Sequence, residues 1–190
     1  MAIEDSIRIP PDVTTALDSG PTLKTYAVIT SILILFSIGL FWTIRQYGEL
    51  EANAEAVLAP IFVLVGLIGL VWLIMVGFRN YAILKKITTG IYYQRYVDDL
   101  PPDWVERPAR TFNNLMQVPS LFFLACIIML ITDYTDRAQV ILAWIFVASR
   151  YMHAAIYLIW NYVPARFGCF MAGSITLIVI YTRLILDALY

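Results

Sequence analysis

The sequence predicts an all-α integral membrane protein with five membrane-spanning helices. Three observations support this fold class: 61% of the 190 residues are hydrophobic, only 14% are charged, and five long apolar stretches divide the chain. A soluble domain is usually about 45–50% apolar and about 25% charged. Each stretch is close to the roughly 20 apolar residues that a spanning helix needs. The runs are continuous rather than alternating, which argues against membrane strands.

The expected spans follow one another with short connections, apart from one long connection over residues 79–110. That connection is expected to continue the second helix at least as far as Gly90, since no helix-breaking residue comes earlier. The segment "DDLPPDW" is expected to stop any helix in the connection. Pro119 is expected to kink the third span and free a backbone carbonyl. The spans are residues 26–44, 60–78, 114–131, 138–160 and 168–189.

Basic residues predict the orientation of the chain, because lysine and arginine favour the cytoplasmic side of a membrane. The connections on the other side carry more acidic than basic residues. The N-terminus is therefore expected in the cytoplasm and the C-terminus outside, in a bacterial inner membrane. The long connection carries Arg79, Lys85, Lys86, Arg95, Arg107 and Arg110.

This topology divides the chain into three expected parts. Residues 1–25 form a cytoplasmic tail, residues 26–58 an extra helix and an outer loop, and residues 59–190 a four-helix membrane domain. No basic block is present, so a nucleic-acid partner is not expected. Cys126 and Cys169 both fall inside apolar runs, which argues against a disulfide framework or a metal site.

The fourth span carries a stripe of polar residues. Arg150, His153, Tyr157 and Asn161 follow at positions i, i+3, i+7 and i+11, which places them on one helix face. Arg150 lies about 15 Å below the turn at Pro164, at about 1.5 Å per residue. A charge at the bilayer centre costs at least about 2.5–3.5 kcal/mol, so such residues usually face a protein interior or a wet cavity.

The third span carries a matching stripe near its start, formed by Arg110, Asn114 and Gln117, with Asn113 at its edge. Both stripes are expected in the cytoplasmic half of the membrane, and Arg166 follows just after the fourth span. We expect Arg110, Arg150 and Arg166 to converge, with Gln117 facing Arg150. Because neither stripe holds an acidic residue, the pattern favours an anionic ligand. Hydrogen bonding between helices is the alternative role for these side chains.

Two segments resemble a known family. "RTFNNLMQVP" at residues 110–119 and "RYMHAAIYLIWNYVPAR" at residues 150–166 are similar to the MAPEG superfamily, the membrane-associated proteins of eicosanoid and glutathione metabolism. The motifs are most similar to those of prostaglandin E synthase-like and bacterial members. The resemblance implies a MAPEG-like four-helix bundle, a homotrimer, and glutathione bound between adjacent subunits near the cytoplasmic face. The extra N-terminal helix is a departure from this pattern.

The resemblance also implies roles for single residues. Arg166 matches an arginine that stabilises the glutathione thiolate, so it is the expected catalytic residue. Gln117 replaces a family glutamate and keeps hydrogen-bonding capacity without the charge. The remaining expected glutathione-site residues are Arg110, Asn114 and Tyr157, with Arg150 and His153 in the inner polar network and Arg79 as a further contact.

Three functions remain open from the sequence. The first is a glutathione-dependent transferase or peroxidase that acts on lipophilic electrophiles or lipid hydroperoxides from the membrane. The second is a non-catalytic accessory subunit, which the extra helix would dock onto other subunits of a membrane complex. The third is a lipid- or quinone-binding module that uses the same arginines.

Overall fold

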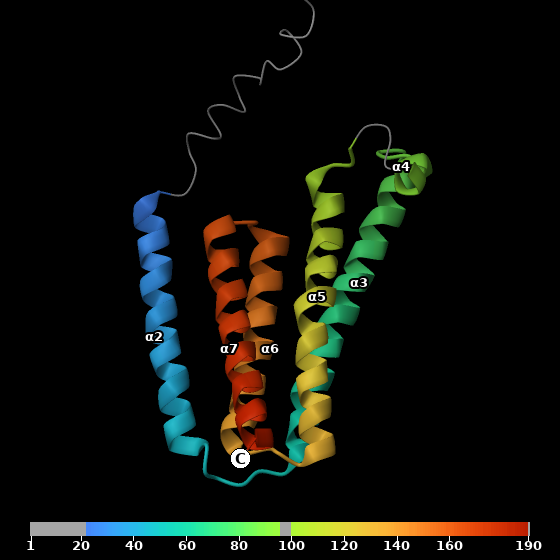
Figure 1. Ribbon diagram of the computed structural model, residues 1–190. Helices are drawn as coiled ribbons and strands as arrows, with labels where there is room; N and C mark the ends of the chain where they lie inside the picture. The colour runs from blue at the N-terminus through green and yellow to red at the C-terminus, as the bar shows by residue number, and fades with distance from the viewer. Residues whose placement is uncertain (1–21, 96–99, 190) are drawn as a thin grey trace, which may run out of the picture.

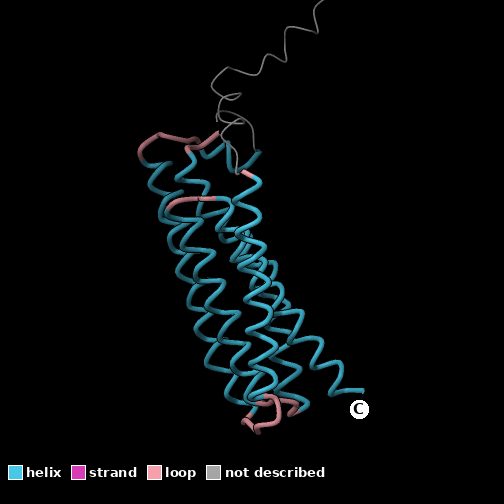
Figure 2. The backbone as a smooth tube through the Cα atoms, turned by 90° about the vertical axis from the view of Figure 1, so that its left-hand side faces the viewer, coloured by secondary structure: helices cyan, strands magenta, loops and turns pink. Residues whose placement is uncertain are grey.

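The computed structural model describes residues 22–95 and 100–189, and the described part of the chain is a helical bundle without strands. Five of its helices are long and apolar enough to cross a membrane, which confirms the predicted fold class. Figure 1 shows the helices side by side, and Figure 2 shows the loops confined to the two ends of the bundle. Residues 1–21 of the expected tail lie outside the described part.

Four of the five long helices extend beyond the apolar runs that predicted them. Helix α2 is Leu23–Tyr47, α3 is Leu58–Leu84 after a short 3-10 turn η2 at Ala54–Val57, and α4 is Gly90–Arg95. Helix α5 is Asp103–Thr132, α6 is Arg137–Ile159 and α7 is Val163–Leu189. Polar residues at the membrane ends remain helical, so a hydropathy pattern gives only the central part of each helix.

The prediction that the second helix continues to Gly90 was wrong. Helix α3 ends at Leu84 because Lys86 adopts a left-handed backbone conformation, with φ of 55°. The amide of Ile87 then donates to the carbonyl of Ala82 at 2.9 Å, which closes the helix in the manner that glycine usually provides. Nothing in the sequence marks this lysine as a helix end.

The core lies between α3, α5, α6 and α7. Helix α6 packs most extensively on α7, and α3 packs on α5. Phe122 of α5 stacks on Phe146 of α6, with ring centroids 4.6 Å apart, and both side chains are fully buried. Two tyrosine hydroxyls also join helices, because Tyr151 donates to the Val63 carbonyl and Tyr181 to the Leu121 carbonyl. Together these contacts hold a four-helix unit.

Helix α2 lies outside this unit, against α6 and α7 (Figure 1). Leu40 is its only buried residue, and most of its large apolar side chains are exposed. Its far end is tied to the bundle, since the Arg137 amide donates to the Leu50 carbonyl at 2.9 Å. Gly48 also packs close to Arg183, which pairs with Asp136 at the start of α6.

Candidate functional site

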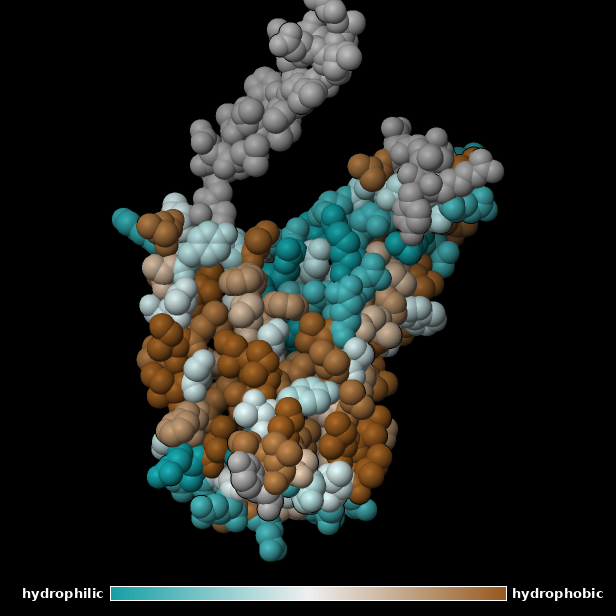
Figure 3. Space-filling model, in the orientation of Figure 1, coloured by the Kyte–Doolittle hydropathy of each residue, from teal (hydrophilic) through white to brown (hydrophobic). Residues whose placement is uncertain are grey.

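A polar cavity of about 250 Å³ lies where α5, α6 and α7 meet, at the end of the bundle where α6 ends and α7 begins. The space-filling view shows hydrophilic side chains gathered in a hollow between two hydrophobic flanks (Figure 3). No acidic residue lies among its lining residues. These are Arg110, Asn113, Asn114, Gln117, His153, Tyr157 and Arg166.

The turn between α6 and α7 positions Arg166. Asn161 has a left-handed backbone with φ of 51°, a conformation that asparagine tolerates, and its amide donates to the Ile156 carbonyl at 2.7 Å. The Asn161 Oδ1 atom accepts a hydrogen bond from Arg166 Nη1 at 2.7 Å. The Arg166 guanidinium also lies 4.0 Å from the centroid of the Tyr157 ring. Arg166 is therefore fixed by neutral groups that leave its charge uncompensated.

His153 is buried at the wall of the cavity. Its Nδ1 atom lies 3.0 Å from the Arg166 backbone carbonyl, which can only accept, so Nδ1 carries a proton and donates. In the neutral ring Nε2 is then an acceptor, and this atom is buried without a partner. The Oδ1 atom of Asn114 is buried and unpartnered as well. Two lining residues thus present unused acceptor atoms.

Helix α5 brings an acidic residue that the sequence reasoning missed. Asp103 pairs with both Arg107 and Arg110, so the expectation that the stripes hold no internal anion was wrong. The cause is the helix boundary: α5 begins at Asp103 rather than at residue 114, which places residues 103, 107 and 110 on one face. Arg107 also donates to the Leu158 carbonyl at 3.3 Å, which fixes α5 beside the end of α6.

Arg150 does not line the cavity, so the expected convergence of three arginines was wrong. Its side chain is fully buried, and its Nη2 atom donates to the carbonyls of Cys169 at 3.2 Å and Phe170 at 2.9 Å on α7. Its guanidinium also lies 5.2 Å from the centroid of the Phe146 ring. No hydrogen bond joins it to Gln117, which is exposed at the cavity.

Arg79 also lies away from the cavity. It pairs with Glu106 at 3.6 Å across the contact between α3 and α5, and its guanidinium lies 4.9 Å from the centroid of the Tyr93 ring. Burial, followed by the nearby Glu106 carboxylate, raises the pKa of Tyr93. The expected role of Arg79 as a ligand contact therefore finds no support in its position, because its neighbours are those of a helix-joining residue.

The remaining site residues named from the sequence do come together. Arg110, Asn114 and Gln117 of α5 face His153 and Tyr157 of α6 across one cavity, with Arg166 of α7 at its edge. The fold and the cavity define a helical membrane protein with a cationic polar site at one end of the bundle. Whether glutathione occupies this site stays a prediction.

Comparison with protein families identifies this class. The model of the MAPEG family matches residues 57–186, from the last residue of η2 through most of α7, and the chain belongs to this family. Helix α2 lies entirely outside the matched region. Comparisons with curated proteins and with solved structures found no match.

Proposed function

We propose that the polar cavity binds glutathione and that the chain is a glutathione-dependent transferase or peroxidase for lipophilic electrophiles or lipid hydroperoxides. The observation that carries this proposal is the composition of the cavity wall. It combines two arginines with amide groups and buried acceptor atoms, and no carboxylate lies among the lining residues. A wall of this kind suits a ligand that carries negative charge together with N–H donors.

The lining residues fit the polar groups of glutathione. Arg110 and the amide of Asn113 would donate to its carboxylates. The buried acceptors Asn114 Oδ1 and His153 Nε2 would accept from its N–H groups, which would relieve two costly unpaired atoms. Gln117 offers both a donor and an acceptor at the cavity. Arg110 has one exposed carboxylate partner, and the two buried acceptor atoms have no partner in the described structure.

Arg166 is the proposed catalytic residue. Glutathione supplies a thiol whose deprotonated form is the reactive nucleophile. Arg166 lies in the first turn of α7, where its guanidinium and the positive end of the helix dipole both favour an anion. Asn161 and Tyr157 hold the side chain in place without neutralising it. The protein therefore contributes an oriented positive charge rather than a nucleophile of its own.

A non-catalytic accessory subunit is the second candidate. One observation favours it: Asp103 already pairs with Arg110, which reduces the charge available to a ligand. An arginine that already has a carboxylate partner within the protein needs no anionic ligand to compensate its charge. In this alternative the same fold would serve to dock other membrane subunits, and α2 is the helix outside the family match that would make the contact.

The chain is also proposed to form a homotrimer whose neighbouring subunit covers the open side of the cavity. The support is family membership, together with glycines on α3 that no other residue approaches. Small residues allow helices to approach closely, although they do not specify three copies. Native mass spectrometry from mild detergent should show a trimer, and a monomer alone would contradict this part of the proposal.

An activity assay tests the function. Purified protein in lipid vesicles should consume glutathione with an aryl halide or a lipid hydroperoxide, and Arg166→Gln should lose most of this activity. The matched control is Arg137→Gln, an exposed arginine at the opposite end of the bundle, which should keep it. Turnover that is absent from wild type, or unchanged in Arg166→Gln, would contradict the proposal and favour the accessory subunit.

A further inference from the structure

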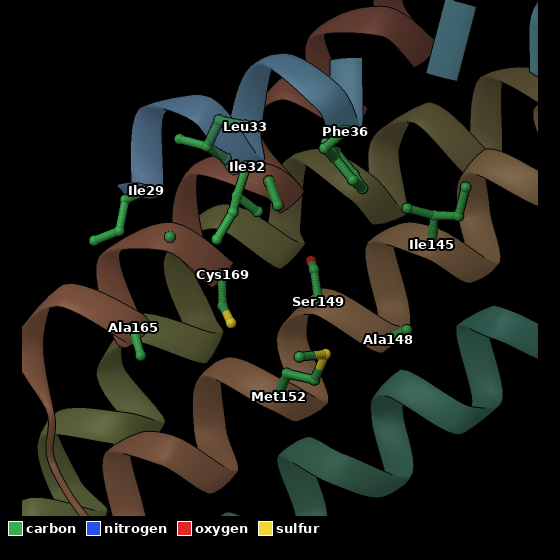
Figure 4. A pocket seen from close by; sticks show the side chains of 12 residues that line it. Ile29, Ile32, Leu33, Phe36, Ile145, Ala148, Ser149, Met152, Ala165 and Cys169 are labelled. Atoms are coloured by element: carbon green, nitrogen blue, oxygen red, sulfur yellow. The ribbon is translucent and has the colours of Figure 1, made fainter. Parts of the chain in front are cut away.

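A second cavity, of about 390 Å³, lies on the other side of the α6–α7 pair, between these helices and α2. Figure 4 shows side chains from all three helices around it, with Ser149 and Cys169 between apolar neighbours. The apolar wall includes Ile29, Ile32, Leu33 and Phe36 of α2, Ile145, Ala148 and Met152 of α6, and Ala165, Gly168 and Ala172 of α7. The MAPEG match excludes α2, so the family region alone does not form this cavity.

Helix α2 contributes only apolar atoms to this cavity. The hydroxyl groups of Thr30, Ser31 and Ser37 each donate to a carbonyl of α2 itself, four residues earlier, at 2.8–2.9 Å. In the described residues of α2, no side-chain hydrogen bond reaches another helix. The polar attachment lies beyond its far end, at the contact between Leu50 and Arg137. Along the cavity, α2 is therefore held by apolar contact alone.

The shape and chemistry of the cavity restrict its occupant. Water is a poor occupant because a buried water needs two to four polar partners, and the Ser149 hydroxyl already donates to the Phe146 carbonyl at 2.6 Å. An empty cavity would lose the dispersion contacts of its wall. A spanning helix of a second copy does not fit, because it is about 30 Å long, whereas the cavity wall covers only eight residues along each of its three helices. A single flexible hydrocarbon chain meets all three conditions.

We propose that one acyl chain of a bilayer phospholipid occupies this cavity and joins α2 to the α6–α7 pair. The volume falls within the range of about 300–1,000 Å³ that is typical of small-molecule sites. The bilayer supplies such chains at high concentration on every side of the bundle. The acyl chain packs against Phe36 and Met152 and completes a contact that the protein side chains leave unfilled. This binding site is independent of glutathione binding.

Photo-crosslinking tests the proposal. The full chain is reconstituted in vesicles that contain phosphatidylcholine with a diazirine in one acyl chain, and labelled residues are mapped by peptide mass spectrometry. Phe36 and Cys169, both partly buried, should be labelled several-fold more than Leu35, an α2 residue that is 68% exposed and is not part of this wall. Native mass spectrometry should retain phospholipid on the wild-type chain.

Two variants separate the cavity from general lipid contact. Ala148→Phe fills the cavity and should remove the enrichment at Phe36 and Cys169. Ala27→Phe, at an exposed position on the opposite face of α2 from the cavity wall, should preserve it. Equal labelling of Phe36, Cys169 and Leu35 in wild type would overturn the proposal. So would enrichment at Phe36 and Cys169 that stays unchanged in a folded Ala148→Phe variant. If Ala148→Phe does not fold, the wild-type labelling and lipid retention still decide the question.

Discussion

Arg150 and Arg166 lie in opposite kinds of surroundings, although both belong to the same polar stretch of the sequence. Arg150 lies within the α6–α7 contact, where carbonyls of α7 and two aromatic rings surround its guanidinium. Arg166 lies at the edge of a cavity, where Asn161 and Tyr157 orient it and no carboxylate in the described part of the chain pairs with it. The guanidinium of Arg150 is used in packing α6 against α7, whereas the guanidinium of Arg166 remains available to a ligand.

The difference shows that a buried arginine in a membrane helix is not in itself evidence of a ligand. Such residues pair with one another, with backbone carbonyls or with a substrate. These cases are told apart by which groups accept hydrogen bonds from the arginine N–H donors. Most of the Arg150 donors serve the protein, although its Nη1 atom remains unpartnered. The polar cavity is stronger evidence of a ligand site than Arg150 is, because unpaired acceptors and an unpaired cation occur there together.

The largest expected effect concerns the membrane side to which the cavity opens. Basic residues predict that the end with the polar cavity faces the cytoplasm, which places the C-terminus outside. A reporter that is active only outside the cytoplasm, fused at the end of the chain, should therefore be fully active. A cytoplasm-specific reporter at the same position should be silent, and the reverse result would place Arg166 on the other side of the membrane.

The next effect concerns the packing around Arg150. A Cβ atom at Gly173 would lie 2.2 Å from Arg150 Nη2 and 2.4 Å from Ser149 Oγ, so Gly173→Ala crowds a fully buried side chain. We expect a loss of about 1–3 kcal/mol in the free energy of unfolding. Unfolding in detergent measures it. Combining Gly173→Ala with Arg150→Met should recover part of the loss, and an equal loss in both backgrounds would contradict this account of Arg150.

A smaller effect is expected at the cavity. Asp103→Asn removes the carboxylate that pairs with Arg110, so glutathione should bind a few-fold more tightly. The effect is modest because exposed ion pairs are worth about 0.2–1 kcal/mol, and the Arg110 side chain is 48% exposed. Isothermal titration calorimetry at low salt measures the affinity. Weaker binding would show that Asp103 positions Arg110 for the ligand instead of competing with it.

The smallest effect concerns Gln117. Gln117→Glu adds a carboxylate to the cavity, at an exposed position that solvent screens. Glutathione has an ammonium group to compensate, so its affinity should change little. An analogue that lacks the amine should bind more weakly to the variant than to wild type in parallel titrations. If Gln117→Glu weakens the binding of both ligands equally, the ammonium group of glutathione does not lie near residue 117.

Much of this fold follows from the sequence, because long apolar runs leave few alternatives to spanning helices. Helical spacing together with the expected topology predicted that His153 and Tyr157 lie near the polar residues of α5. Two of the errors share one cause, which is that hydropathy does not mark helix ends. Starting α5 too late hid Asp103, and the left-handed Lys86 gave no signal of its own.

The position of Arg150 could not be predicted for a different reason. Helix periodicity gives the direction in which a residue points but not how far a long side chain reaches. Arg150 reaches the carbonyls of α7 because Gly173 leaves room for its guanidinium. That contact joins residues far apart in the sequence and depends on how α6 and α7 pack. The apolar cavity likewise depends on how α2 lies against them.

The central claim is that Arg166, and not Arg150, faces the ligand. Glutathione binding to wild type, Arg166→Met and Arg150→Met, measured by calorimetry in lipid nanodiscs, tests it most directly. Arg166→Met should bind about tenfold more weakly or worse, since a hydrogen bond to a charged group contributes about 1.5–3 kcal/mol. Arg150→Met should bind as wild type does, provided that thermal unfolding shows both variants folded. Loss of binding in Arg150→Met alone, or no binding to wild type, would contradict the account.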